Sequence, residues 1–173
     1  FSDMVEKITI PSFRKDICVG CIKGFRPLPS NDTVMKLQCG NRYLYIPRYM
    51  KPSTINEGID DIEAFFANHK KKVPGIWSYA YTTTCKQNMA FMEYVDFGSE
   101  SAKAYLKKNA KKMALRFMEY DKEELTVRLV KTGLVSQMAL KELLDKAEEK
   151  GMSILKSYIL QCLNDGEGSK QNF

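Results

Sequence analysis

Apolar positions alternate with polar ones over short segments in the first 50 residues, a pattern typical of half-buried strands. Four segments are predicted to be strands or extended apolar stretches: Lys7–Ile10, Ile17–Ile22, Thr33–Cys39 and Arg42–Ile46. The last two flank Gly40 and Asn41, a two-residue hairpin signal, because both residues tolerate positive φ. Pro47 and Pro52 close this β region.

From Ser53 onward the apolar residues recur at helical spacing. The predicted helices cover Ile55–Lys72 and Ile76–Phe97, then run from Ser99 to Tyr120, from Asp121 to Gly133, from Ser136 to Gly151 and over Met152–Leu163. The pattern therefore predicts an α+β chain, with a short β segment packed on an array of five to six helices.

Several helix ends carry recognisable signals. Ser99 and Ser136 stand at N-cap positions, and Asp121 with Glu124 forms a variant of the capping box. Three lysines, at 70–72, are expected near the C-terminus of the first helix, where the helix dipole favours positive charge. We expect residues 1–52 to form the β portion, 53–164 the helical array and 165–173 a flexible tail.

The last four helices show an internal rhythm. Three apolar residues recur about 30 positions later: Leu125, Leu129 and Val130 as Leu155, Ile159 and Leu160. Helix pairs at that offset resemble a short solenoid of the ankyrin or HEAT type, although the Thr-Pro-Leu-His signature of ankyrin repeats is missing.

The N-terminal segment resembles one unit of the bacterial BspA-like (treponemal) leucine-rich repeats. The matching residues are Ile8, Ile10, Pro11, Ile17 and Gly24, while Cys21 and Ile22 stand at the Ala and Phe positions and the closing cysteine is absent. The resemblance implies the C-terminal end of a larger repeat protein that serves as a scaffold for protein recognition. It carries over no catalytic residue.

Composition narrows the class of protein. The 173 residues are 44% hydrophobic and 28% charged, with a net charge of +6, which is normal for a folded domain with a basic surface. No apolar run approaches the roughly 20 residues that span a bilayer. The chain begins at Phe1, so we expect a fragment of a longer protein. Cys85 and Cys162 fall among apolar helical neighbours, which favours a reducing compartment and a cytoplasmic location.

Candidate chemistry is sparse. Cys18 and Cys21 form a C-x-x-C pair that Cys39 and His69 could complete as a zinc site, but no second C-x-x-C exists, and a core role for Cys21 is favoured. His69 is the only histidine and lies beside three lysines. No nucleotide-binding glycine motif or H-E-x-x-H is present. We therefore expect no enzyme activity, no metal and no cofactor.

Two surfaces could bind a partner. One is a basic helix face made of Lys103, Lys107, Lys108, Lys111, Lys112 and Arg116. This face could contact nucleic-acid phosphates, remain solvated, or pair with Glu123, Glu124 or Glu148. The other is a set of aromatic residues, a type common at protein interfaces, although packing of the hairpin on the second helix would explain them equally well: Tyr43, Tyr45, Tyr49 and Trp77.

These observations favour a non-catalytic protein-interaction or scaffold module that binds a protein partner. The alternative is an accessory protein that binds nucleic acid through the basic helix face. A zinc-dependent or redox protein built on Cys18 and Cys21 ranks last. The sequence identifies no particular partner and sets no oligomeric state.

Overall fold

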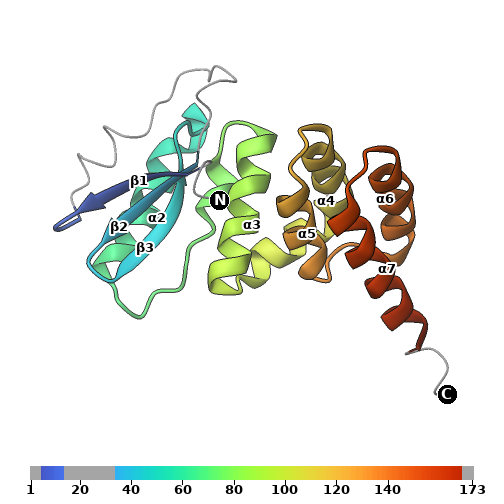
Figure 1. Cartoon of the computed structure of the whole chain (residues 1–173). Coiled ribbons are helices and arrows are strands. Elements are labelled where there is room, and N and C mark those ends of the chain that lie inside the picture. The colour runs from blue at the N-terminus through green and yellow to red at the C-terminus, as the bar shows by residue number, and fades with distance from the viewer. Residues whose placement is uncertain (1–4, 14–33, 169–173) are drawn as a thin grey trace. The chain divides into compact units, whose positions relative to one another are not determined.

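A computed structural model describes residues 5–13 and 34–168, and it confirms the α+β layout: a small sheet is followed by helices (Figure 1). The strands are β1 (Val5–Ile10), β2 (Val34–Cys39) and β3 (Arg42–Pro47). The helices, in chain order, are η3 (Pro52–Thr54), α2 (Ile55–Ala67), η4 (Ile76–Tyr79), α3 (Thr83–Phe97), α4 (Glu100–Glu119), α5 (Glu123–Lys131), α6 (Gln137–Glu149) and α7 (Ser153–Gly168).

The chain divides into two compact units, Phe1–Lys103 and Ala104–Phe173. The division falls inside α4 and not near residue 52, so α2 and α3 belong to the same unit as the sheet. Below, these are called unit 1 and unit 2.

The sheet of unit 1 has the order β1-β2-β3. β2 and β3 form the predicted antiparallel hairpin, with Gly40 at φ 57° in the turn. β1 pairs with β2 in parallel, and its register runs from Val5 opposite Val34 to Ile10 opposite Cys39. Partners in this pairing are 29 positions apart along the chain, a relation that the strand pattern alone does not predict. The predicted stretch Ile17–Ile22 lies outside the described residues.

The hydrophobic core of unit 1 lies where β2 and β3 meet α2 and α3. Leu37 and Leu44 of the hairpin, Ile62 of α2 and Phe91 of α3 are each 0% exposed. Figure 1 shows α2 beside the three strands, and α3 packs on β3. Burial of such side chains is the main driving force for folding this unit.

Two helix predictions in unit 1 were wrong. α2 ends at Ala67, so the lysines at 70–72 lie in the following loop and not in the last turn of the helix. The predicted helix over Ile76–Phe97 is divided into η4 and α3. Its Thr-rich run holds the N-cap of α3, where Thr82 Oγ1 accepts a hydrogen bond from Cys85 N at 3.1 Å.

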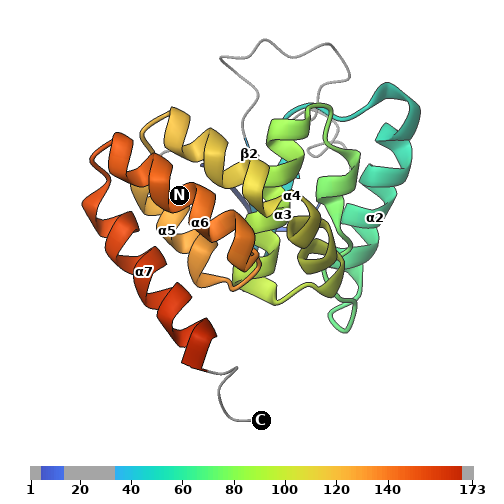
Figure 2. The same ribbon diagram turned by 90° about the vertical axis from the view of Figure 1, so that its right-hand side faces the viewer.

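Unit 2 is made of antiparallel helices, and α6 and α7 run side by side (Figure 2). The turn after α4 and the turn after α6 have the same geometry. Asp121 has φ 53° and Gly151 has φ 67°. Lys122 N donates to Phe117 O at 2.8 Å, and Met152 N donates to Ala147 O at 2.9 Å. Both are Schellman-type helix ends.

The two turns are thus related by the same 30-residue offset that the apolar positions show. Position 121 corresponds to 151, and the bond from Asp121 N to Met118 O, at 3.1 Å, has its counterpart in the bond from Gly151 N to Glu148 O, also at 3.1 Å. The predicted capping role of Asp121 was wrong, because its backbone occupies the left-handed region at the end of α4. The predicted cap at Ser136 is confirmed, since its Oγ accepts from Ala139 N at 3.3 Å.

The C-terminal boundary also differs from the prediction. α7 continues to Gly168, so residues 165–168, expected in a flexible tail, belong to the helix. Residues 169–173 lie outside the described part of the chain.

Candidate functional site

A cavity of about 650 Å³ lies in unit 1, between the β2–β3 turn, the loop after α2 and the α3–α4 junction. The lining residues are Asn41, Arg42, Tyr43, Phe65, Lys71, Lys72, Val73, Phe97, Gly98, Ser99, Glu100 and Ser101. This volume falls in the range of small-ligand and peptide pockets. Of the predicted partner-binding residues, the structure brings only Tyr43 to this cavity.

Arg42 fixes one wall of the cavity. Its guanidinium donates to Phe65 O, to Asn68 O at 2.9 Å and to Lys71 O at 3.0 Å. These carbonyls belong to the end of α2 and the loop that follows, so the side chain satisfies groups that a helix end leaves without partners. The guanidinium carbon also lies 3.8 Å from the centre of the Phe65 ring. Arg42 therefore holds the loop against the hairpin.

Tyr43 and Tyr45 share one carboxylate. Both hydroxyls donate to Asp96 Oδ2, at 2.9 Å and 2.6 Å respectively. Burial, and then the hydrogen bond and the charge of Asp96, raise the pKa of Tyr43. The Lys36 ammonium lies 3.5 Å from the centre of the Tyr43 ring, a cation–π contact. This cluster ties the hairpin to the end of α3.

The four aromatic candidates differ in exposure. Tyr45, Tyr49 and Trp77 are buried, at 9%, 5% and 9% exposed, so their rings pack inside the unit. Tyr43 is half-buried at the cavity wall. Packing thus accounts for three of the four residues, and only Tyr43 keeps a surface that a partner could reach.

Glu93 of α3 is a buried carboxyl, 3% exposed. Burial raises its pKa, while hydrogen bonding with Ser99 and Trp77 acts in the opposite direction. It does not line the cavity, although its neighbour Ser99 does.

The basic face of α4 is only partly free. Lys103 lies 3.5 Å from Glu100, and Lys111 lies 2.5 Å from Glu142 of α6, an acidic partner that we did not predict. Arg116 is half-buried against the Phe117 ring, and burial lowers its pKa. Three lysines are exposed without an ion pair inside the described ranges: Lys107, Lys108 and Lys112.

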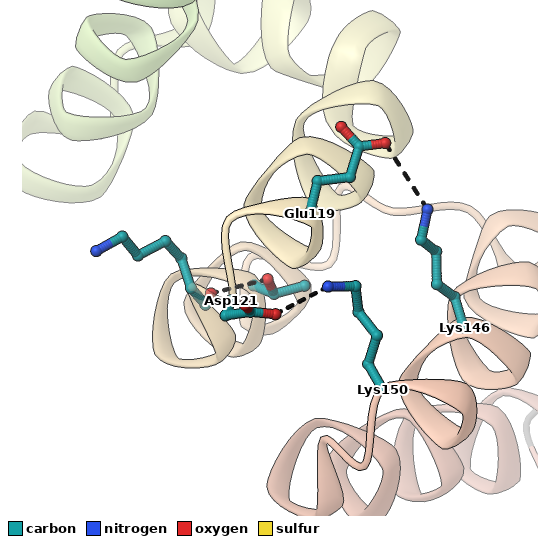
Figure 3. Close-up of polar contacts among 6 residues, drawn as sticks. Glu119, Asp121, Lys146 and Lys150 are labelled. Carbon is teal, nitrogen blue, oxygen red and sulfur yellow. Dashed lines mark hydrogen bonds and ion pairs between the residues drawn. The ribbon is translucent and has the colours of Figure 1, made fainter. Parts of the chain in front are cut away.

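Charged residues connect the helical hairpin α4–α5 to the helical hairpin α6–α7, the first and second hairpins of unit 2 (Figure 3). Glu119 lies 3.8 Å from Lys146, and Asp121 lies 2.8 Å from Lys150. Glu123 Oε1 accepts a hydrogen bond from Leu155 N at 2.9 Å, in the first turn of α7. The α4–α5 turn therefore provides acceptors to the helices that follow it, and the last of them caps α7.

The outer face of α7 carries a shallow groove of about 450 Å³. Its lining residues are uncharged: Ser153, Ile154, Ser157, Tyr158 and Gln161. Ile154 is 69% exposed, an unusual exposure for a large aliphatic side chain. The absence of charged residues from this lining and the presence of Tyr158 are features of interface centres.

The four residues considered as zinc ligands do not form a site that can be described. Cys18 and Cys21 lie outside the described residues. Cys39 is a free thiol, and His69 is exposed beyond the end of α2. Over residues 5–13 and 34–168, no group of three or more His, Cys, Asp or Glu side chains gathers as metal ligands would.

No protein-family model, curated protein or solved structure matches this chain significantly. Among the described helices, none combines the length and apolar content needed to cross a bilayer.

Proposed function

We propose that this chain is a non-catalytic protein-interaction or scaffold module, and that the outer face of α7 contacts its protein partner. The observation that carries this proposal is the 30-residue relation between α5 and α7. α7 packs on α5, the second helix of the first hairpin. Glu123 Oε1 accepts from Leu155 N, and the Lys131 ammonium lies 5.2 Å from the Tyr158 ring.

The positions of α7 that lie 30 residues after this face of α5 are residues that line the α7 groove. Positions 123, 127 and 131 of α5 correspond to Ser153, Ser157 and Gln161. Val127 is 8% exposed, whereas Ser157 is exposed. On α5 this face is covered by α7. Among the residues that the structure describes, no helix covers the equivalent face of α7. A helix of a partner protein would pack there as α7 packs on α5.

The 29-residue register of β1 and β2 gives further support. Parallel in-register strands at this spacing fall within the length of one leucine-rich repeat. Both units then contain chain segments related by a regular offset, an organisation that proteins use to build binding surfaces rather than catalytic sites.

The test compares two substitutions that each place a glutamate at an exposed apolar position. Ile154→Glu alters the α7 face, and Met138→Glu, 77% exposed on α6, is the matched control. Full-length wild type and both variants are crosslinked in cell extract, and captured proteins are quantified. We expect one reproducible partner to be lost with Ile154→Glu and kept with Met138→Glu. Equal capture by all three proteins would refute the α7 interface.

The second candidate function is nucleic-acid binding by α4. The exposed Lys107, Lys108 and Lys112 favour it, because neutralised phosphates give salt-dependent affinity. A labelled duplex should then bind in 50 mM salt, weaken in 200 mM salt, and lose affinity on substitution of the three lysines by glutamate. Exchanging the exposed Lys70, Lys122 and Lys141 for glutamate provides a control of equal charge. Equal loss in both triple variants would exclude a site on α4.

A further inference from the structure

The unit 1 cavity combines an apolar floor with a cationic rim, and it is separate from the α7 face. The floor consists of aromatic rings in fixed positions. Tyr43 and Phe97 have ring centres 5.0 Å apart, and the Tyr43 hydroxyl is held by Asp96 at 2.9 Å. Phe65 is held below the Arg42 guanidinium at 3.8 Å. The apolar surface is therefore formed before any ligand arrives.

The rim is positively charged. Lys71 and Lys72 both line the cavity. Lys71 has only a long contact with Asp61, at 3.7 Å, and Lys72 is exposed without an ion pair inside the described ranges. Glu100 is the one carboxylate among the lining residues, and it lies 3.5 Å from Lys103. The two lysines thus favour an anionic group on the ligand.

The ring faces argue against a nucleobase. Stacking of a base requires an open aromatic face. The Arg42 guanidinium covers one face of Phe65, and the Lys36 ammonium covers one face of Tyr43. One face of each ring is therefore already occupied, and Phe65 is only 4% exposed, so these two rings suit contact with an apolar side chain better than stacking of a base.

We propose that this cavity binds an acidic peptide segment of a protein. A carboxylate of the peptide lies near Lys71 and Lys72, and a neighbouring apolar side chain rests on Tyr43, Phe65 and Phe97. The Ser99 and Ser101 hydroxyls, which share a hydrogen bond at 3.0 Å, add polar groups to the lining beside this carboxylate. This surface adds a second contact to the module and does not depend on the α7 face.

The probe is a fluorescein-labelled octapeptide of alternating Glu and Leu, and its binding to the full chain is followed by anisotropy. The expected result is saturable binding that weakens at least tenfold in Lys71→Glu/Lys72→Glu and at least tenfold when Gln replaces Glu in the peptide. The control Lys107→Glu/Lys108→Glu has the same charge change on exposed α4 residues and should bind as wild type does. Thermal unfolding verifies that each variant is folded, and Lys72→Glu alone avoids added repulsion at Asp61.

Three results would overturn the proposal: no binding at millimolar peptide, equal loss in both double variants, or tighter binding of a thymidine octanucleotide that also depends on Lys71 and Lys72. Equal loss would show attraction to net charge only. Because Ile154 lies in unit 2, the capture experiment with Ile154→Glu stands or fails independently of the cavity.

Discussion

Helix α2 of unit 1 ends by other means than helices α4 and α6 of unit 2. In unit 1, Arg42 of β3 donates to Phe65 O of α2 and to Asn68 O just beyond the helix. In unit 2, α4 and α6 end in left-handed residues whose backbone bonds reach no more than five positions back along the chain. The ends of α4 and α6 are therefore encoded locally, as is the end of α3 in unit 1 at Gly98 with φ 62°, whereas the end of α2 is bound by a side chain distant in sequence.

The largest expected effect is in the core of unit 2. Leu143 of α6 is 0% exposed, so Leu143→Ala should destabilise the protein by about 2–5 kcal/mol through lost burial and a cavity. Urea denaturation followed by far-UV circular dichroism measures it, with the exposed Met138→Ala as control. A loss below about 1 kcal/mol would contradict tight packing of the hairpins.

Next in size is the removal of the distant cap in unit 1. Arg42→Ala leaves carbonyls at the end of α2 without their charged donor, at an expected cost of about 2–3 kcal/mol. Arg42→Lys keeps the charge but loses the forked geometry, so its cost should fall between wild type and Arg42→Ala. An Arg42→Ala variant with the same urea midpoint of unfolding as wild type would contradict this role of Arg42 and would show that α2 ends by local signals.

Substitutions in the two related turns of unit 2 should change stability by smaller amounts, and in opposite directions. Gly151→Ala should destabilise by about 1–2 kcal/mol, because a side chain is strained at its φ of 67°. Asp121→Gly relieves the same strain and gives up only an exposed ion pair with Lys150, so stability should stay equal or rise. Thermal unfolding of both variants tests the relation, and a loss of stability in Asp121→Gly equal to that in Gly151→Ala would break it.

The smallest effect is expected from the charges between the hairpins. Lys146→Met and Lys150→Met should each cost about 0–1 kcal/mol, since the partner carboxylates are largely exposed. The cost should shrink in 1 M salt, where screening shortens the reach of charges to about 3 Å. Lys141→Met, on the exposed side of α6, is the control. A cost that persists in high salt would point to side-chain packing instead of charge.

The sequence predicts most of what is local. Gly40 with Asn41 marks the hairpin, Ser136 caps α6, and the 30-residue rhythm of apolar positions reappears in the bonds of two turns. Thr82 could have been identified as the cap of α3, since threonine favours that position over a helix interior.

The sequence does not predict what depends on distant contacts. The end of α2 at Ala67 follows from Arg42, and the burial of Tyr45 and Trp77 follows from packing that residue type cannot show. The cavity combines three segments spread over 61 positions, from Asn41 to Ser101, and only Tyr43 among its residues had been singled out as a partner contact. For Lys71 and Lys72, the sequence shows only their positive charge, which does not indicate that they line a cavity.

The most direct test of the interaction module is hydrogen exchange of the full chain with and without its captured partner. Backbone amides of Ser153–Gln161 should exchange more slowly in the complex, because a partner helix on the α7 groove stabilises that helix against opening. Peptides from α5, which α7 already covers, should change little. Slowed exchange confined to other segments, with α7 unchanged, would contradict the proposed interface.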